Sequence, residues 1–225
     1  GFTLTDGSAG IQISPWTYGH EISHNTVIGN EFGIRGHYDV HDVTIFNNTI
    51  SSNIFVGLEM CFYHSKVTGN VISSNGGGEF AELSAGIEIV EGVYDTTIYS
   101  DNNTVIDNII ENNFNGVLSV WYSEGNLFSH NTFKNNTKNI FAGDPLSMSN
   151  NTFEENYWSD YKGQDWNGDG IGDTPYWFSV QSNDAHPLMS PYQYWSNPIV
   201  GDINRDMRVN IVDLALAGKA FGSSP

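Results

Sequence analysis

Hydrophobic residues along this chain come in short alternating runs, not at helical spacing. Val27, Ile50 and Ile72 each lie in a run of one or two apolar residues, and Asn or Gly separates one run from the next. Alternation over a few residues is typical of strands with one buried face. Asn and Gly disfavour helices and favour bends. The pattern therefore predicts an all-β chain of short strands.

The runs repeat at a constant period. A polar residue followed by Asn and an apolar run, as in residues 24–30, recurs with the lead asparagine at positions 25, 48, 70, 108, 131 and 151. The period is about 22 residues, with one insertion near residues 76–100. A glycine followed by an apolar residue recurs as a second landmark, at Gly10, Gly33, Gly57, Gly86 and Gly116.

A repeat of this length is one coil of a right-handed parallel β-helix, in which equivalent positions stack about 4.8 Å apart. We expect about six coils in residues 1–156. Asn is expected in the left-handed conformation at the bends, with its amide bonded to the amide one coil away. A β-sandwich would also give short strands, but it does not explain a repeat that preserves particular side chains.

More specific motifs follow the repeats. Residues 156–161 read Asn-Tyr-Trp-Ser-Asp-Tyr, residues 165–176 are rich in Asp and Gly, and residues 186–189 read His-Pro-Leu-Met. With the repeats, they resemble the archaeal type of the NosD-like, carbohydrate-binding and sugar-hydrolase (CASH) family of single-stranded parallel β-helices. The resemblance implies an aromatic cap over residues 157–198. Members include surface proteins, polysaccharide enzymes and a copper-site accessory protein, so the resemblance leaves the activity open.

Residues 165–173 form the first candidate calcium loop. Oxygen-bearing side chains at alternate positions, with Gly170 at the turn, suit Ca²⁺, which takes six to eight oxygen ligands. Position 12 is Tyr176 where such loops have Glu, so Asp160 or Asp184 would have to close the site. An Asp- and Gly-rich surface turn is the alternative interpretation. The predicted ligands are Asp165, Asn167, Asp169, the carbonyl of Ile171, and Asp173.

Residues 199–225 hold the second candidate calcium loop. It is followed by a segment of helix-forming composition and is similar to one repeat of a dockerin, in an EF-hand-like loop-helix tail. That resemblance implies a cohesin-like partner, although a full dockerin has two repeats. Met207 departs from the usual Gly at position 6. The implied ligands are Asp202, Asn204, Asp206, the carbonyl of Arg208, Asn210 (directly or through water), and Asp213.

Charged residues also recur at one place in the repeat. Arg35, Glu59 and Glu88 each follow the coil glycine by two residues, on the face opposite the inward apolar side chains. Two stacked carboxylates beside an arginine are candidates for an acid/base pair acting on a polysaccharide. The alternative is a ladder of ion pairs that keeps the sheet soluble.

Three histidines give a weaker metal hypothesis. His20, His41 and His64 are separated by 21 and 23 residues, close to the period of the repeat. Stacked on successive coils, neutral imidazoles could bind a transition metal. Surface histidines with ordinary hydrogen bonds are the alternative.

Composition narrows the setting. Eight Lys and Arg against 26 Asp and Glu give a net charge of −18, which argues against nucleic acid and anionic membranes as partners. The single cysteine, Cys61, allows no intrachain disulfide, and no apolar run approaches the roughly 20 residues of a membrane helix.

We therefore expect an extracellular or cell-surface protein. The leading hypothesis is a calcium-binding structural or adhesive protein that assembles head to tail into a homo-oligomer or polymer. The first alternative is a polysaccharide lyase or glycoside hydrolase, and the second is a carbohydrate-binding or dockerin-type scaffold module with a glycan or cohesin-like partner.

Overall fold

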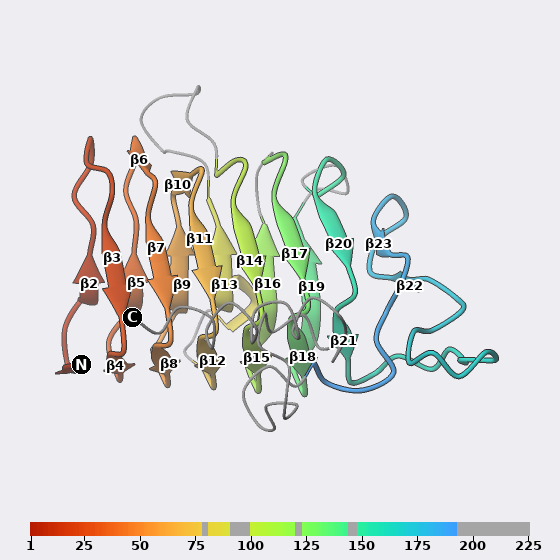
Figure 1. Cartoon of the computed structure of the whole chain (residues 1–225). Coiled ribbons are helices and arrows are strands. Elements are labelled where there is room, and N and C mark those ends of the chain that lie inside the picture. Colours follow the sequence, from red (N-terminus) through yellow and green to blue (C-terminus); the bar gives the residue numbers. More distant parts are fainter. Residues whose placement is uncertain (78–80, 91–99, 120–122, 144–147, 193–225) are drawn as a thin grey trace, which may run out of the picture. The chain divides into compact units, whose positions relative to one another are not determined.

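The computed structural model describes residues 1–77, 81–90, 100–119, 123–143 and 148–192. The chain divides into two compact units, Gly1–Tyr192 and Gln193–Pro225. The first unit is the predicted parallel β-helix, with about six coils and almost no helix (Figure 1). Within the described residues the only helical element is a 3₁₀ turn, η1 (Ala81–Leu83), and no helix there is long and apolar enough to cross a membrane. The second unit lies outside the described residues.

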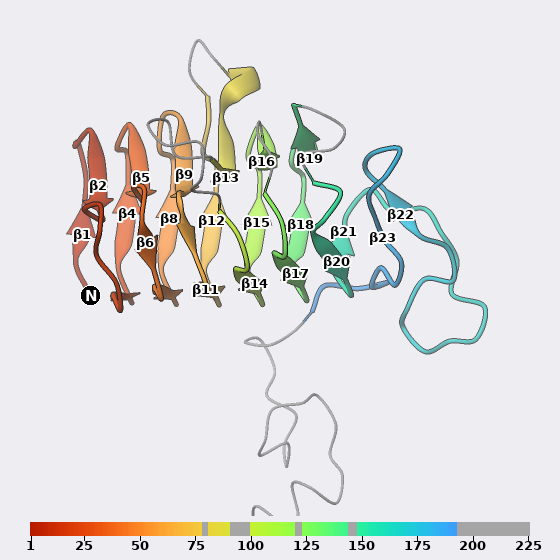
Figure 2. The ribbon, with the colours of Figure 1, turned by 90° about the horizontal axis from the view of Figure 1, so that it is seen from above.

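Each coil contributes one strand to each of three parallel sheets, seen side by side in Figure 2. Sheet A contains β1 (Thr3–Leu4), β4 (Thr26–Ile28), β8 (Thr49–Ser51), β12 (Val71–Ser73), β15 (Ile109–Glu111), β18 (Thr132–Lys134) and β21 (Tyr157–Trp158). Sheet B contains β2 (Ala9–Gln12), β5 (Phe32–Arg35), β9 (Val56–Met60), β13 (Ala85–Ile89), β16 (Asn115–Ser119) and β19 (Lys138–Ala142).

The other strands complete the coils. Sheet C is the short pair β6 (Val40–His41) and β10 (Phe62–Tyr63). Sheet D contains β3 (Glu21–Ser23), β7 (Thr44–Phe46), β11 (Lys66–Thr68), β14 (Thr104–Ile106), β17 (Leu127–Ser129), β20 (Thr152–Glu154), β23 (Asn183–Asp184) and β22 (Tyr176–Trp177). Every pair is parallel except β22 and β23, which run antiparallel at the C-terminal end of sheet D.

Inward side chains stack in columns, one residue per coil. In sheet A the column is Leu4, Val27, Ile50, Ile72, Ile110, Phe133 and Trp158. The column turns from aliphatic to aromatic toward the C-terminal end, where the rings of Phe133 and Trp158 stack at 4.3 Å and those of Trp158 and Tyr176 at 4.5 Å. Broad rings therefore cover the C-terminal end of this column. The aromatic cap over residues 157–198 stays a prediction, and residues 193–198 of it lie outside the described residues.

The landmark glycines mark places where a neighbouring coil comes too close for a side chain. A Cβ on Gly57 would lie 2.7 Å from both the Gly86 carbonyl oxygen and the Asn75 amide nitrogen. The same conflict recurs at Gly33 against the backbone of Gly57. The glycine repeat is therefore a packing requirement of coil on coil.

Bends between sheets use left-handed residues, but the lead asparagines are not those residues. Positive φ is found one position earlier, for example at His24 (59°), Asn47 (54°) and His130 (54°). Asparagine does adopt the expected left-handed conformation at bends, at Asn47, Asn102, Asn112 and Asn135, but the asparagine that carries the ladder is the residue after the bend. The bend residue points to solvent, whereas the asparagine after it must turn its amide inward, where it is buried.

The predicted amide ladder is confirmed. Asn70 Oδ1 accepts hydrogen bonds from the backbone N–H and side-chain amide of Asn48, at 2.9 and 3.0 Å. Asn70 Nδ2 donates to the carbonyls of Ile45 and Thr68 and to Asn108 Oδ1. These bonds supply bend N–H and C=O groups with the partners that strand pairing leaves out.

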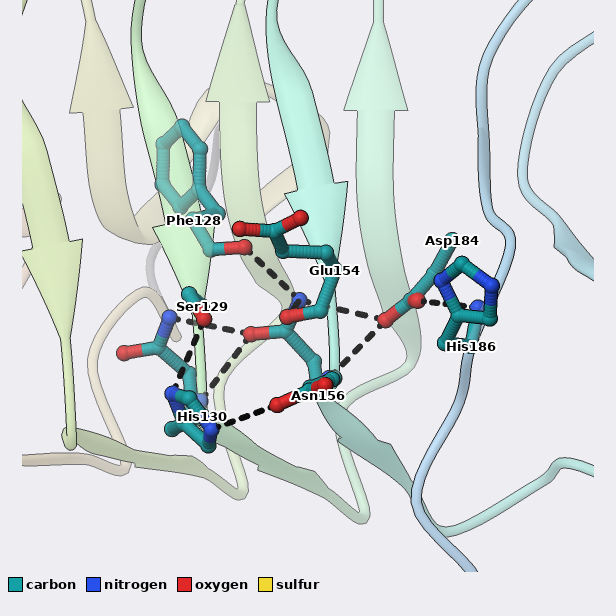
Figure 3. A network of polar contacts seen from close by, with 9 residues as sticks. Phe128, Ser129, His130, Glu154, Asn156, Asp184 and His186 are labelled. Carbon is teal, nitrogen blue, oxygen red and sulfur yellow. Dashed lines mark hydrogen bonds and ion pairs between the residues drawn. The ribbon is translucent and has the colours of Figure 1, made fainter. Parts of the chain in front are cut away.

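One ladder runs through Asn25, Asn48, Asn70, Asn108, Asn131 and Asn156 and ends at Asp184, which is fully buried (Figure 3). Asp184 Oδ2 accepts from the backbone N–H and the amide of Asn156 and from Trp158 Nε1, and Oδ1 accepts from the His186 N–H. A carboxylate only accepts when ionised, so it ends the chain of amides without leaving a donor unpaired.

The repeat that the sequence predicts at Asn151 belongs to a different bend. Asn151 pairs with Asn126 in a second ladder, along the bend before sheet D, and Asn156 pairs with Asn131. Phe153 accordingly stacks on Phe128 rather than on Phe133. Because Asn-Thr-Phe occurs at both bends, the local sequence alone does not tell the two apart.

We predict that Asn70→Ala lowers the free energy of unfolding by about 2–4 kcal/mol, since it removes five hydrogen bonds and leaves the Asn48 N–H buried without a partner. Urea denaturation measures the change. Thr49→Ala, at an exposed position of β8, is the control, with an expected loss below about 1 kcal/mol. Equal losses in the two variants would contradict a stabilising role for the ladder.

Candidate functional site

The predicted charged ladder exists on the outward face of sheet B. Gln12 pairs in register with Arg35, Arg35 with Glu59, and Glu59 with Glu88. Strand alternation puts Ile34, Leu58 and Ile87 in the core and turns these charged neighbours outward. The next coils continue the same row with Leu118 and Phe141, so the row changes from charged to apolar.

Arg35 and Glu59 form the closest ion pair of this face. Arg35 Nε donates to Glu59 Oε1 at 2.8 Å, and the guanidinium carbon lies 4.3 Å from the centre of the Phe32 ring. Contact with both an aromatic face and a carboxylate fixes the orientation of the guanidinium.

The two carboxyl groups are much less exposed than the sequence suggested. Glu59 is 7% exposed, and burial raises its pKa against the opposing effect of Arg35. Burial, together with repulsion from Glu59, raises the pKa of Glu88 to about 7. At neutral pH Glu88 is therefore partly protonated, while Glu59 has a cationic partner. The alternative interpretation, a ladder of ion pairs, holds for Arg35 and Glu59, but the Glu59 carboxylate is buried and none of the ion pairs found among the described residues includes Glu88.

Two further residues near this row, His37 and Cys61, have perturbed side chains. His37 Nε2 is buried without a hydrogen-bond partner. Burial lowers the pKa of the imidazole, and the positive charge of Arg35 lowers it further. Cys61 is buried, and burial raises the pKa of its thiol to about 11. The imidazole is thus neutral and the thiol protonated at neutral pH. The position of His37 two residues after Arg35 suggested that it lies near the row, but the repeat gave no signal for the burial of either side chain.

The loop of residues 165–173 is closed on its own backbone. Asp165 accepts from the N–H groups of Gly168, Asp169 and Gly170, and Asp173 accepts from the Trp166 N–H. Among the described residues, no ion pair neutralises Asp165, Asp169 or Asp173.

Neither residue proposed to complete this loop is available in the described structure. Asp184 ends the asparagine ladder, and Asp160 accepts from the Asn139 amide at 2.8 Å and the Tyr176 hydroxyl at 3.1 Å. The predicted ligands Asp202, Asn204, Asp206, Arg208, Asn210 and Asp213 lie outside the described residues.

The three histidines do not stack on one another. The His41 ring stacks between Tyr18 and Tyr63, with both centroid distances at 5.1 Å, and its Nδ1 lies 2.8 Å from Asp42. His64 occupies the left-handed bend position, and the His20 carbonyl accepts from Thr44. Their spacing matches the period only to within a residue, and one residue changes the direction of a side chain completely.

His130 makes a further side-chain contact that sequence reasoning did not predict. Its Nε2 lies 2.8 Å from Glu155 Oε2 at the bend of the next coil, and its Nδ1 lies 2.9 Å from Ser129 Oγ (Figure 3). The contact ties two successive bends together. His130 and Glu155 are 25 positions apart, so a 22-residue period did not pair them.

The comparisons with known proteins agree with this architecture. Residues 1–163 match the family described as periplasmic copper-binding protein (NosD). The chain belongs to the NosD family. A relative, "Probable ABC transporter binding protein NosD" of Stutzerimonas stutzeri, is 28% identical over 139 residues, which are 60% of this chain. The match spans 31% of that relative. No solved structure matches the chain.

The described residues do not fit a copper site of several ligands. No three His, Cys, Asp or Glu side chains come together there as a metal site, and each of the three stacked-histidine candidates occupies a different place on its coil. Copper favours imidazole and sulfur ligands, whereas the buried Cys61 thiol has a pKa of about 11.

We predict that Glu88→Gln makes stability less dependent on pH. The folded-state pKa of Glu88 is raised from 4.5 to about 7, so the native protein binds more protons than the unfolded chain between these values. This carboxyl group therefore destabilises the fold progressively as pH rises through that window. Urea denaturation on both sides of it should show Glu88→Gln gaining stability over the parent above pH 7, whereas Glu154→Gln, at an exposed position, should not.

Proposed function

We propose that this protein is an exported, calcium-braced β-helix that acts as a rigid structural or adhesive element at the cell surface or in the periplasm. A family described as periplasmic supports export. The solenoid supports rigidity, since three sheets share one continuous core and the bends are crossed by buried amides. Assembly through its ends and a cohesin-like partner for the tail remain predictions.

One observation carries the calcium part of the proposal. Three carboxylates within nine residues lie in the exposed loop of residues 165–173, with no Lys or Arg pairing them in the described structure. A divalent cation would relieve the repulsion between them. Binding would require Asp165 and Asp173 to exchange the backbone N–H groups they now accept from for the ion.

A second candidate function, a polysaccharide lyase or glycoside hydrolase, is favoured by the carboxyl pair of sheet B. Neighbouring parallel strands lie about 4.8 Å apart, and carboxyl pairs that work by double displacement are about 5–5.5 Å apart. Glu88, with its pKa of about 7, would be the acid, and Glu59, paired with Arg35, the carboxylate.

We predict that Ca²⁺ raises the melting temperature and that the loop of residues 165–173 accounts for part of the effect. Calcium at about 100 times its dissociation constant adds about 2.7 kcal/mol of stability for one site. Asp206→Asn disables the candidate loop of the tail, so calorimetric titration of this variant with Ca²⁺ measures binding by the loop of residues 165–173 alone. Adding Asp169→Asn to the same variant should abolish the remaining binding. Asp6→Asn, an exposed aspartate at another bend, is the charge-matched control. Unchanged binding in the double variant would contradict the first site.

The second candidate predicts release of reducing or unsaturated ends from a panel of polysaccharides that includes uronate-containing ones. Glu88→Gln and Glu59→Gln should each lower the rate about 100-fold or more, because each removes an acid/base group. Gln12 lies in the same row but is uncharged, so Gln12→Ala should retain the rate of the parent. No turnover of any polysaccharide by the parent, or equal turnover in all variants, would exclude this function.

A further inference from the structure

The chain contains three Asn-Gly pairs, and the structure gives them very different surroundings. Asn75 and Asn115 are almost fully buried, whereas Asn167 is exposed in the loop of residues 165–173. Asn-Gly pairs are chemically labile because glycine leaves its backbone nitrogen free to approach the preceding side chain. The question is therefore which pair has the groups that such a reaction needs.

The loop around Asn167 supplies a base and a donor to the amide oxygen. The Gly168 backbone N–H, the nucleophile of the reaction, donates to Asp165 Oδ1 at 2.6 Å. The Asp169 N–H donates to Asn167 Oδ1 at 3.1 Å, where negative charge develops in the transition state. Asn167 Nδ2, the leaving nitrogen, donates to Asp169 Oδ2 at 2.9 Å. A base and an oxyanion donor thus belong to one short loop, and the Asp169 carboxylate fixes the orientation of the amide that leaves.

Space also favours reaction at this pair. Gly168 has φ +76°, and nothing lies within 4 Å of the place a Cβ would occupy. At the buried pairs the groups are engaged elsewhere. The Gly76 N–H donates to the Asn53 carbonyl, and the Asn75 amide belongs to a ladder. The Asn115 amide donates to the carbonyls of Glu82 and Ser84.

We propose that the loop of residues 165–173 is a self-modifying site at which Asn167 is deamidated with Asp165 as general base. The Gly168 nitrogen forms a bond to Asn167 Cγ, and its proton passes to Asp165. The Cγ–Nδ2 bond breaks as Nδ2 takes up the proton now held by Asp165, directly or through water, and leaves as ammonia, so that Asp165 is restored and a succinimide ring results. Water then opens the ring to aspartate or isoaspartate, so no oxidant or cofactor is needed.

The product changes the chemistry of the loop. Deamidation places a fourth carboxylate among Asp165, Asp169 and Asp173, and aspartate at this position offers a cation a charged oxygen in place of an amide oxygen. Isoaspartate instead lengthens the backbone by one carbon within the tight turn. One consequence rests on the proposed function: bound calcium would occupy Asp165 and so protect Asn167 from deamidation.

The test follows deamidation of the purified full-length chain in a calcium-free buffer by peptide mapping, with fragmentation that separates aspartate from isoaspartate. The same chain unfolded in urea gives the intrinsic rate of each Asn-Gly pair. Asn167 should react roughly tenfold or more faster in the folded chain than in the unfolded one, whereas Asn75 and Asn115 should react more slowly when folded. A folded-state rate at Asn167 equal to or below the unfolded rate would overturn the proposal.

Variants separate the base from general exposure. Asp165→Asn should slow the reaction at Asn167 about tenfold, and Asp160→Asn, outside the loop, should leave it unchanged. An unchanged or faster rate in Asp165→Asn would also overturn the proposal. Saturating Ca²⁺ should slow the parent. If deamidation follows the pattern above but Ca²⁺ has no effect, the self-modifying site stands and the calcium function fails.

Discussion

From Asn25 onward, the described coils of this solenoid carry asparagine amides into its interior, and the hydrogen bonding of these amides is the constraint on which the rest of the structure depends. A bend interrupts strand pairing, so its N–H and C=O groups would be buried without partners. The amides of one coil supply those partners to the coil before it, as Asn70 does for Asn48. The core columns, the glycine positions and the outward rows of sheet B are all held in register by this contact.

The same regularity explains where chemistry can arise on this protein. Stacking places any outward side chain directly beside its equivalent one coil away, so charged residues at equivalent positions of successive coils become neighbours. Glu59 and Glu88 are such a pair, and their burial raises the pKa of both carboxyl groups. Outside the coils, the loop of residues 165–173 has no such neighbour and satisfies its carboxylates within itself.

Periodicity predicted the fold, the inward columns and the Arg35–Glu59–Glu88 row, because these depend on register alone. It could not predict burial of Glu59, which depends on what covers a face and not on the position within a repeat. It placed Asn151 on the wrong bend, because two bends of one coil carry the same Asn-Thr-Phe sequence. The histidine ladder failed for a related reason, since a spacing of 21 or 23 residues is not the same position in coils of varying length.

The coils differ in length, but the distance between successive ladder amides does not change with coil length. Asn70 and Asn108 are 38 positions apart, yet their amides meet at 3.0 Å, as closely as those of Asn48 and Asn70, which are 22 apart. Extra residues therefore accumulate between strands without any adjustment of the core. A protein built in this way can acquire new surface segments, one coil at a time, while its core columns stay unaltered, which separates the evolution of its surface from the evolution of its interior.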